Sequence, residues 1–156
     1  MLCLFVHAGS ERLAIQAAAI LEVVPAVRLH EPVGVPSWVA GVFRFRGVVT
    51  PVIDLHRLAA GGPCPIRLST RIVIVEFSTL DGPRPLGLLA ERVTELKLLN
   101  ATGPGYAPGG SPAGPDLGPL VSDGEGVVRV TSVARLVPAE YRETLFGRVE
   151  SLRSGA

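Results

Sequence analysis

Residues 39–58 read VAGVFRFRGVVTPVIDLHRL, two apolar and β-branched runs separated by Arg46-Gly47. Two such runs around a short break that contains glycine predict a β-hairpin. Gly47 can adopt the left-handed backbone that a tight turn requires, and Arg46 would stand at the tip of that turn.

The register of this hairpin follows from side-chain alternation along its two strands. A two-residue turn would set Arg44 against Val49, whereas a three-residue turn ending at Val48 places Phe45 beside Val49 and Arg44 beside Thr50. The second arrangement keeps apolar side chains on one face and polar ones on the other. We therefore predict the three-residue turn.

The sequence predicts mostly short strands for the rest of the chain. An alternating or unbroken apolar pattern followed by turn residues predicts each of them. Because proline donates no hydrogen bond, the strand that holds Pro25 should lie at a sheet edge or carry a bulge. Close spacing of short strands is typical of all-β barrels and sandwiches. The predicted strands are residues 2–6, 12–15, 22–29, 71–77, 86–99, 120–121 and 127–130.

Helix and loop signals are fewer. The alanine-rich residues 16–21 predict a turn or two of helix, and Ser37 is a suitable N-cap for a helical turn through Ala40. Gly and Pro residues predict loops over 58–68 and over Gly103–Pro119, which holds six Gly and five Pro.

A C-terminal helix is expected to begin at Pro138, a residue suited to a first helical turn. Tyr141, Leu145, Val149 and Leu152 recur at helical spacing and would form one apolar face. That face either packs back onto the domain or meets a partner.

Composition excludes several functional classes. The chain has 156 residues, enough for one compact unit, and a net charge of +1, which offers no field for nucleic-acid binding. No apolar run approaches the ~18 residues of a membrane-spanning helix, so direct membrane insertion is not expected. The apolar N-terminus lacks the charges and cleavage site of a signal peptide, which favours a cytoplasmic protein.

Catalytic and cofactor motifs are poorly represented. Asp54 and His56 would lie on one strand face and could hold a metal together with Glu76. We nevertheless predict that the protein is not an enzyme and needs no cofactor. The sequence contains neither of the two glycine-rich phosphate-binding motifs, G-x-x-x-x-G-K-[ST] and a strand-linked G-x-G-x-x-G. His7, His30 and His56 share no spacing, and none has the helical setting of a phosphoacceptor.

The stretch GVFRFRGVVTPVIDL resembles the signature of the CheW family of chemotaxis coupling proteins, roughly G-V-h-N-L-R-G-x-h-h-P-V-h-D-L, where h is hydrophobic. Arg44-Phe45 replaces the usual Asn-Leu, and Glu91 stands at a later position where the family has Asp. The segment ILEVVPAVRLHEPVGVPSWVAGV before the signature is also similar to the family. Eight signature positions match, namely Gly41, Val42, Arg46, Gly47, Pro51, Val52, Asp54 and Leu55.

This resemblance implies an all-β fold of two SH3-like five-stranded β-barrel subdomains packed side by side over residues 1–137, followed by a C-terminal helix and tail over 138–156. It implies an adaptor that couples the cytoplasmic tip of a chemoreceptor, a methyl-accepting chemotaxis protein, to the regulatory domain of a CheA-type histidine kinase at membrane receptor arrays. The groove between the barrels would take the receptor tip, and open barrel edges would pair with the kinase. The partner-binding positions implied are Glu22, Gly41, Arg46, Gly47 and Val93.

Alternatives remain open at this point. The phrases RLSTRIVIVEF, LGLLAERVTE and RLVPAEYRETLF resemble couplers of Wsp-type surface-sensing pathways, whose output is a diguanylate cyclase that makes cyclic di-GMP. A small-molecule-binding barrel with the Gly/Pro loop as a lid is a different class of function. So is a metal enzyme built on Asp54, His56 and Glu76. A stand-alone module that modulates receptor arrays would keep the fold and change the role.

Overall fold

The computed structural model describes residues 1–106 and 115–147, apart from the side chain of Thr94. The described chain is dominated by strands joined through tight turns. The strands are β1 Leu2–Ala8, β2 Glu11–Gln16, β3 Ile20–Pro25, β4 Val39–Phe45, β5 Val48–Asp54, β6 Arg71–Thr79, β7 Gly82–Leu98, β8 Thr102–Tyr106, β9 Leu120–Asp123 and β10 Gly126–Thr131. The helical segments are η1 Ala17–Ala19, α1 Leu55–Ala60, α2 Val133–Leu136, η2 Ala139–Tyr141 and α3 Arg142–Phe146.

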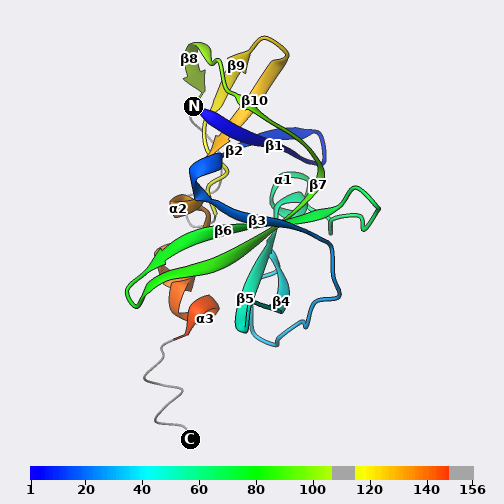
Figure 1. The fold of residues 1–156 in the computed structure, drawn as a ribbon, viewed down its shortest axis with the longest axis vertical. Helices are drawn as coiled ribbons and strands as arrows, with labels where there is room; N and C mark the ends of the chain where they lie inside the picture. Colours follow the sequence, from blue (N-terminus) through cyan, green and yellow to red (C-terminus); the bar gives the residue numbers. More distant parts are fainter. Residues whose placement is uncertain (107–114, 148–156) are drawn as a thin grey trace, which may run out of the picture.

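The strands form two barrels that share β7. The first barrel contains β3, β6, the N-terminal part of β7, β5 and β4. The second contains the C-terminal part of β7 with β1, β2, β10, β9 and β8. Figure 1 shows β7 passing from the lower barrel to the upper one. A strand of 17 residues is long enough to take part in both.

Three apolar clusters correspond to this arrangement. One fills the first barrel and includes Phe45 and Val52, and another fills the second and includes Phe5 and Val128. The largest cluster lies between the barrels and draws on β1, β2, β5, β6 and β7, with the C-terminal segment covering part of it. We call these the first core, the second core and the shared core.

The alternation of β6 shows why its sequence is almost continuously apolar. Ile72 and Ile74 belong to the first core, while Val73 and Val75 belong to the shared core. Successive side chains of a strand point to opposite faces, so a strand between two cores must be apolar at every position. The prediction of a central strand covered on both faces is confirmed.

The predicted register of the β4–β5 hairpin is wrong by one residue. Arg44 pairs with Val49 and Phe45 with Val48, so the turn has two residues rather than three. Both turn residues have left-handed backbones, and this primed turn matches the twist of paired strands. Pairing Arg44 with Val49 costs little burial because Val49 is 63% exposed on the outer face.

Several other local predictions need correction. Trp38 lies in a turn and β4 begins at Val39, so no helical turn follows Ser37. Helix α1 begins inside the region predicted as strand and loop, and β8 begins at Thr102 and runs into the Gly/Pro segment as far as Tyr106. The 3-10 helix η1 and the edge position of β3 agree with the sequence predictions.

The C-terminal helical segment packs back onto the domain. Tyr141 meets the ring of Trp38 edge to face, with 5.5 Å between centroids. Phe146 stacks on Phe77 of β6 at 5.1 Å. These contacts cover one end of the shared core, which favours the domain-packing interpretation of the apolar face. Val149 and Leu152 lie outside the described residues.

Candidate functional site

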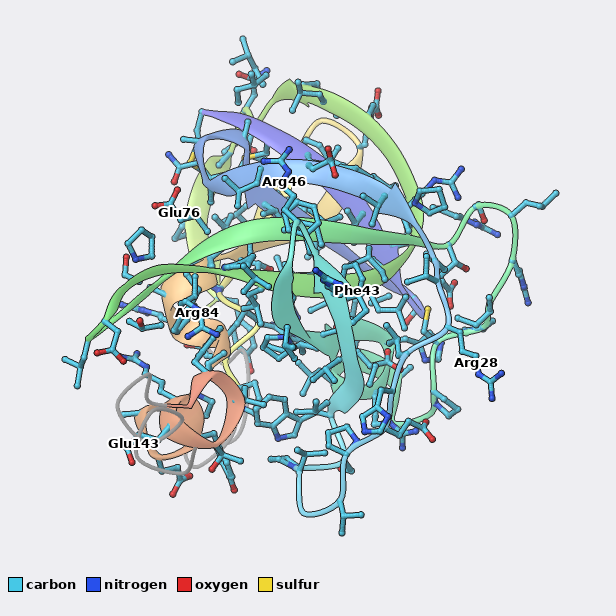
Figure 2. All side chains as sticks on the ribbon, turned by 60° about the horizontal axis from the view of Figure 1, so that its bottom comes forward. Arg28, Phe43, Arg46, Glu76, Arg84 and Glu143 are labelled. Carbon is cyan, nitrogen blue, oxygen red and sulfur yellow. The ribbon has the colours of Figure 1, made fainter. Side chains whose placement is uncertain are left out.

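Two of the sequence-predicted residues meet at the tip of the β4–β5 hairpin. Arg46 Nη2 lies 3.3 Å from Glu22 Oε1 of β3, and the two side chains are 67% and 42% exposed. The guanidinium also stands over the ring of Phe45, 5.0 Å from its centroid. Figure 2 shows Arg46 at the hairpin tip beside β3. The pair joins the signature to the family-like segment that precedes it, at an open surface.

The backbone of the turn fixes where Arg46 points. Arg46 and Gly47 have φ values of 48° and 80°. Arginine is rarely left-handed, because its Cβ crowds the following carbonyl, so the local strain is carried by the hairpin pairing on both sides. Gly47 carries no such cost. The two residues therefore act together: glycine permits the tight turn and the turn presents the arginine.

Gly41 is required by a close backbone approach. It sits in a β-bulge of β4 with φ 151°, and a Cβ there would lie 2.6 Å from the carbonyl oxygen of His30. His30 and Val42 exchange two backbone hydrogen bonds of 2.9 and 2.8 Å. Any side chain at Gly41 would push this crossing segment away from β4, so the residue shapes the barrel rather than touching the Arg46 pair.

Val93 occupies a different place. It lies on β7, partly buried against the shared core, just after Arg92, whose φ is 44°. β7 bulges here: His7 pairs with Glu91 and Phe5 with Glu95. The structure brings Glu22, Arg46 and Gly47 together and places Val93 in the second barrel's part of β7.

An exposed apolar surface extends the shared core outward. Val23 pairs with the shared-core residue Val73, and Leu96 pairs with the shared-core residue Leu4. Directly paired residues lie on the same side of a sheet, so Val23 and Leu96 point toward the space between the barrels. We name this set the inter-barrel surface: Leu2, Val23, Leu96 and Leu98, which are 43%, 39%, 56% and 63% exposed.

The structure does not bring the acid-base candidates together at one site. Asp54 caps α1, accepting hydrogen bonds from the amides of Arg57 at 3.1 Å and Cys64 at 3.0 Å. His56 lies on α1 rather than on a strand, with Nε2 3.3 Å from Glu91 Oε1. Glu76 is an exposed residue of β6. Across residues 1–106 and 115–147, no three His, Cys, Asp or Glu side chains are grouped as metal ligands.

Both cysteines are buried free thiols. Burial, and after it the nearby Asp54 carboxylate, raise the pKa of Cys64 to about 12. Burial also raises the pKa of Cys3. Since the thiolate is the reactive form, neither cysteine is suited to nucleophilic chemistry at neutral pH.

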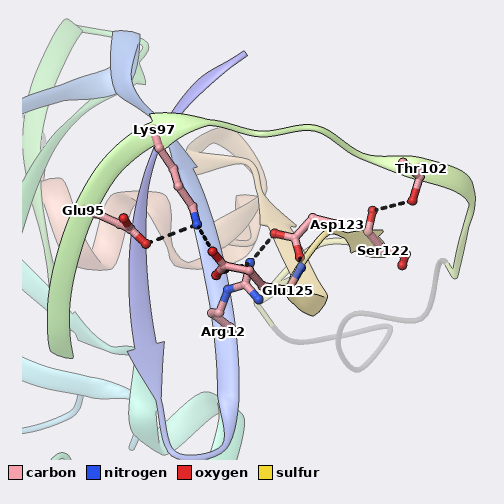
Figure 3. Close-up of polar contacts among 7 residues, drawn as sticks. All are labelled: Arg12, Glu95, Lys97, Thr102, Ser122, Asp123 and Glu125. Carbon is pink, nitrogen blue, oxygen red and sulfur yellow. Dashed lines mark hydrogen bonds and ion pairs between the residues drawn. The ribbon is translucent and has the colours of Figure 1, made fainter.

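Sequence reasoning missed a charged network on the second barrel (Figure 3). Arg12 of β2 pairs with Asp123 at the end of β9, and Lys97 of β7 bridges Glu95 at 3.1 Å and Glu125 at 2.8 Å. These residues are up to 111 positions apart in the chain, so no local pattern announces their contact. The network ties the β9–β10 turn to β2 and β7.

Two pKa values reflect this network. Hydrogen bonds to Glu125 and then Glu95 raise the pKa of Lys97. Burial acts to raise the pKa of Asp123, but the hydrogen bonds from the Glu125 amide and from Arg12 outweigh it, so the pKa of this carboxyl is lowered. Both groups are therefore charged at neutral pH, as ion pairing requires.

Comparison with known proteins decides the family. The model of the CheW-like domain matches residues 2–140. The chain belongs to the CheW-like family. Protein FrzA of Myxococcus xanthus is 34% identical over 89 residues, which are 57% of this chain and 53% of FrzA. The match thus spans about half the length of FrzA.

The fold agrees with a solved member of the family. The crystal structure of the scaffolding protein TtCheW from Thermoanaerobacter tengcongensis superposes with a TM-score of 0.69 at 20% identity, covering 94% of this chain and 90% of TtCheW. The predicted all-β fold of two barrels with a small C-terminal helix is confirmed. At the level of the family, members are scaffold proteins rather than enzymes. In the part of this CheW-like chain that the structure describes, no helix is long and apolar enough to span a membrane.

Proposed function

We propose that this CheW-like protein is a non-enzymatic adaptor that couples the cytoplasmic tip of a methyl-accepting chemoreceptor to the regulatory domain of a CheA-type histidine kinase. The observation that carries this proposal is the exposed Glu22–Arg46 pair, which joins the family signature to the family-like segment before it and is set at the edge of the first barrel. A guanidinium held at a turn tip is suited to charge-assisted bonds with a partner carboxylate.

The inter-barrel surface supports the receptor half of the proposal. Val23 and Leu96 extend the shared core into solvent, so an amphipathic helical segment laid there would bury exposed aliphatic area. Glu22 is the neighbour of Val23 but points to the opposite face of β3, toward the hairpin. The two surfaces therefore lie on opposite faces of one edge strand.

The free edge of β3 supports the kinase half. In the described part of the chain, β3 pairs only with β6, which leaves its other edge available for a strand of a like-folded domain. Gly41, Gly47 and Val93 complete the proposed partner-binding set with the charged pair, Gly41 by keeping the crossing segment at His30 close to β4. An adaptor of this type acts by geometry: it holds receptor and kinase so that a small receptor shift biases the kinase between two states.

Capture from native cell extract tests the proposal. Wild type, Arg46→Glu and the matched control Arg135→Glu, an exposed arginine on α2, are compared by quantitative mass spectrometry. A receptor and a histidine kinase should be enriched with wild type and with Arg135→Glu, and at least one of them should be lost with Arg46→Glu. Equal capture by all three proteins would refute the role of Arg46. Absence of both partners from wild type would refute the adaptor.

A second variant separates the two partners. Leu96→Asp places a charge on the inter-barrel surface and should remove the receptor while the kinase is retained. Loss of both partners together would show that the variant acts on the fold instead.

The pathway is proposed to be Wsp-like, with cyclic di-GMP rather than motility as its output. Support comes from the phrase RLVPAEYRETLF, which supplies all of η2 and α3. Deletion of the gene should lower the activity of a diguanylate cyclase under surface growth. If the deletion alters motility alone and leaves the cyclase activity unchanged, the chain would be assigned to a chemotaxis pathway. The adaptor role would remain intact.

A further inference from the structure

The loop between α1 and β6, residues 61–70, exposes aliphatic side chains although its backbone is firmly anchored. Ile66 is 68% exposed and Leu68 is 95% exposed. Large aliphatic side chains in a loop normally turn inward, because their exposure forfeits hydrophobic stabilisation. The loop projects from one side of the first barrel in Figure 1.

Hydrogen bonds fix this loop from both ends. The hydroxyl of the buried Thr70 donates to Pro65 O at 2.7 Å and accepts from the Arg67 amide at 2.9 Å. The Thr70 amide donates to Arg67 O at 3.0 Å. The Cys64 amide is bound by Asp54, and the Cys64 side chain is part of the first core. The backbone that carries Ile66 and Leu68 is thus preorganised, which lowers the entropy cost of binding.

The surroundings of the two aliphatic residues are basic. Arg67 lies between them in sequence, and the guanidinium of Arg71 donates to the carbonyls of Leu68 and Thr70 at the base of the loop. Arg71 pairs with Pro25, so the exposed Arg28 follows just beyond that strand end. Figure 2 shows the Arg28 side chain directed into solvent.

No carboxylate neutralises this patch from within the loop, since residues 61–71 contain no acidic residue. Asp54 is 3% exposed and is occupied as a cap, and Glu91 is paired with His56. Among the described residues, the side chains of Arg28 and Arg67 make no hydrogen bond or ion pair. The charge of the patch is therefore directed outward.

We propose that this loop is a second docking surface, distinct from the Glu22–Arg46 pair, for a protein segment that presents aliphatic side chains among carboxylates. Ile66 and Leu68 would supply the apolar anchors, and Arg67 and Arg28 the charge-assisted bonds. An anionic membrane is the less favoured occupant, because lipid surfaces are read by clusters of about four to eight basic residues, more than the patch offers. The inference does not depend on the receptor and kinase assignments.

A defined probe tests the proposal with the full chain. The probe is a synthetic amphipathic helix with leucine at positions i, i+3, i+4 and i+7 and glutamate elsewhere, and its control has lysine in place of glutamate. Amide chemical shifts should change over residues 61–71 on addition of the glutamate peptide. Leu68→Ser and Arg67→Glu should each weaken binding by about tenfold or more, as removal of an interface anchor does.

Three controls make each outcome decisive. Leu80→Ser, at a side chain 100% exposed on the β6–β7 turn, and Arg46→Glu should both bind the probe as wild type does. All variants should keep the wild-type melting temperature, because exposed side chains contribute little to stability. The proposal is overturned by no binding at millimolar peptide, by equal binding of the lysine peptide, or by binding to phosphatidylglycerol vesicles without binding to the peptide.

Discussion

The first barrel is closed mainly by apolar packing, whereas the second relies on charge. The first core combines Phe45, Val52 and β6 isoleucines with several partly buried neighbours. The second core has one large ring, Phe5, among smaller side chains. Arg12 and Lys97 stand over that ring, 5.3 and 4.9 Å from its centroid, and both belong to the ion-pair network.

This difference separates stability from recognition. In the second barrel, the Arg12–Asp123 pair is 16% and 7% exposed, so its charges are used internally. In the first barrel, the Glu22–Arg46 pair is largely exposed, so its charges remain available to a partner. The barrel that carries the signature therefore keeps its charged pair at the surface, whereas the second barrel encloses its own.

The largest loss of stability is expected from a substitution in the shared core. A loss confined to one barrel would contradict the view that both barrels depend on this core. Leu88→Ala removes a fully buried side chain between the barrels and should lower the free energy of unfolding by about 2–5 kcal/mol. Hydrogen exchange should accelerate in both barrels, because both pack on this core. Protection retained in β9 and β10 alone would show that the second barrel folds independently. Leu80→Ala, at the exposed turn, is the matched control.

A smaller loss is expected from Arg12→Met, and it should be local. The substitution leaves the nearly buried Asp123 without its arginine, which costs about 1.5–3 kcal/mol for a hydrogen-bonded charge. Hydrogen exchange should accelerate at β9 and β10 more than at β4 and β5. A uniform change over the chain would mean that the network does not belong to the second barrel in particular.

Acidification should weaken the same region. The folded-state pKa of Asp123 is lowered, so its stabilising contribution is complete above the unfolded carboxyl pKa of about 3.9 and is lost as the pH falls through the folded value. The difference in stability between wild type and Asp123→Asn, measured by urea unfolding, should shrink as the pH is lowered from 7 toward 3. A difference that does not change with pH would contradict the assignment.

The pattern of the strands was predictable from sequence where burial alone determined it. The continuous apolar run of β6 predicts a central strand, and Pro25 predicts an edge strand or a bulge, of which β3 has the edge position. The CheW-like signature added the two-barrel architecture, which alternation by itself left open between barrel and sandwich. The β6 strand and the edge position of β3 depend on the alternation of side chains along a strand and on the backbone N–H that proline lacks. Both are local properties of the sequence.

The errors arose where backbone geometry or distant contacts decided the structure. The two-residue turn depends on Arg46 accepting a left-handed backbone, which its residue type does not predict. Helix α1 has a local signal, Asp54 as N-cap and Gly61 as C-cap, but the apolar alternation of β5 continues into Leu55 and hides the start of the helix. The network around Phe5 brings together four separate strands and turns, so only the folded chain reveals it.

The smallest expected effect on stability belongs to the proposed binding pair and sharpens the contrast with Arg12. Arg46→Gln should change the free energy of unfolding by no more than about 0.5 kcal/mol, because exposed ion pairs contribute little. A double-mutant cycle with Glu22→Gln should give a coupling below about 1 kcal/mol, which added salt reduces. Partner capture should nevertheless fall with Arg46→Gln. A coupling as large as that expected for Arg12 would mean that the pair holds β3 to the hairpin. A structural role of Arg46 in the fold would then explain the arginine at this turn of the signature. A guanidinium exposed for a partner carboxylate would not be needed to explain it.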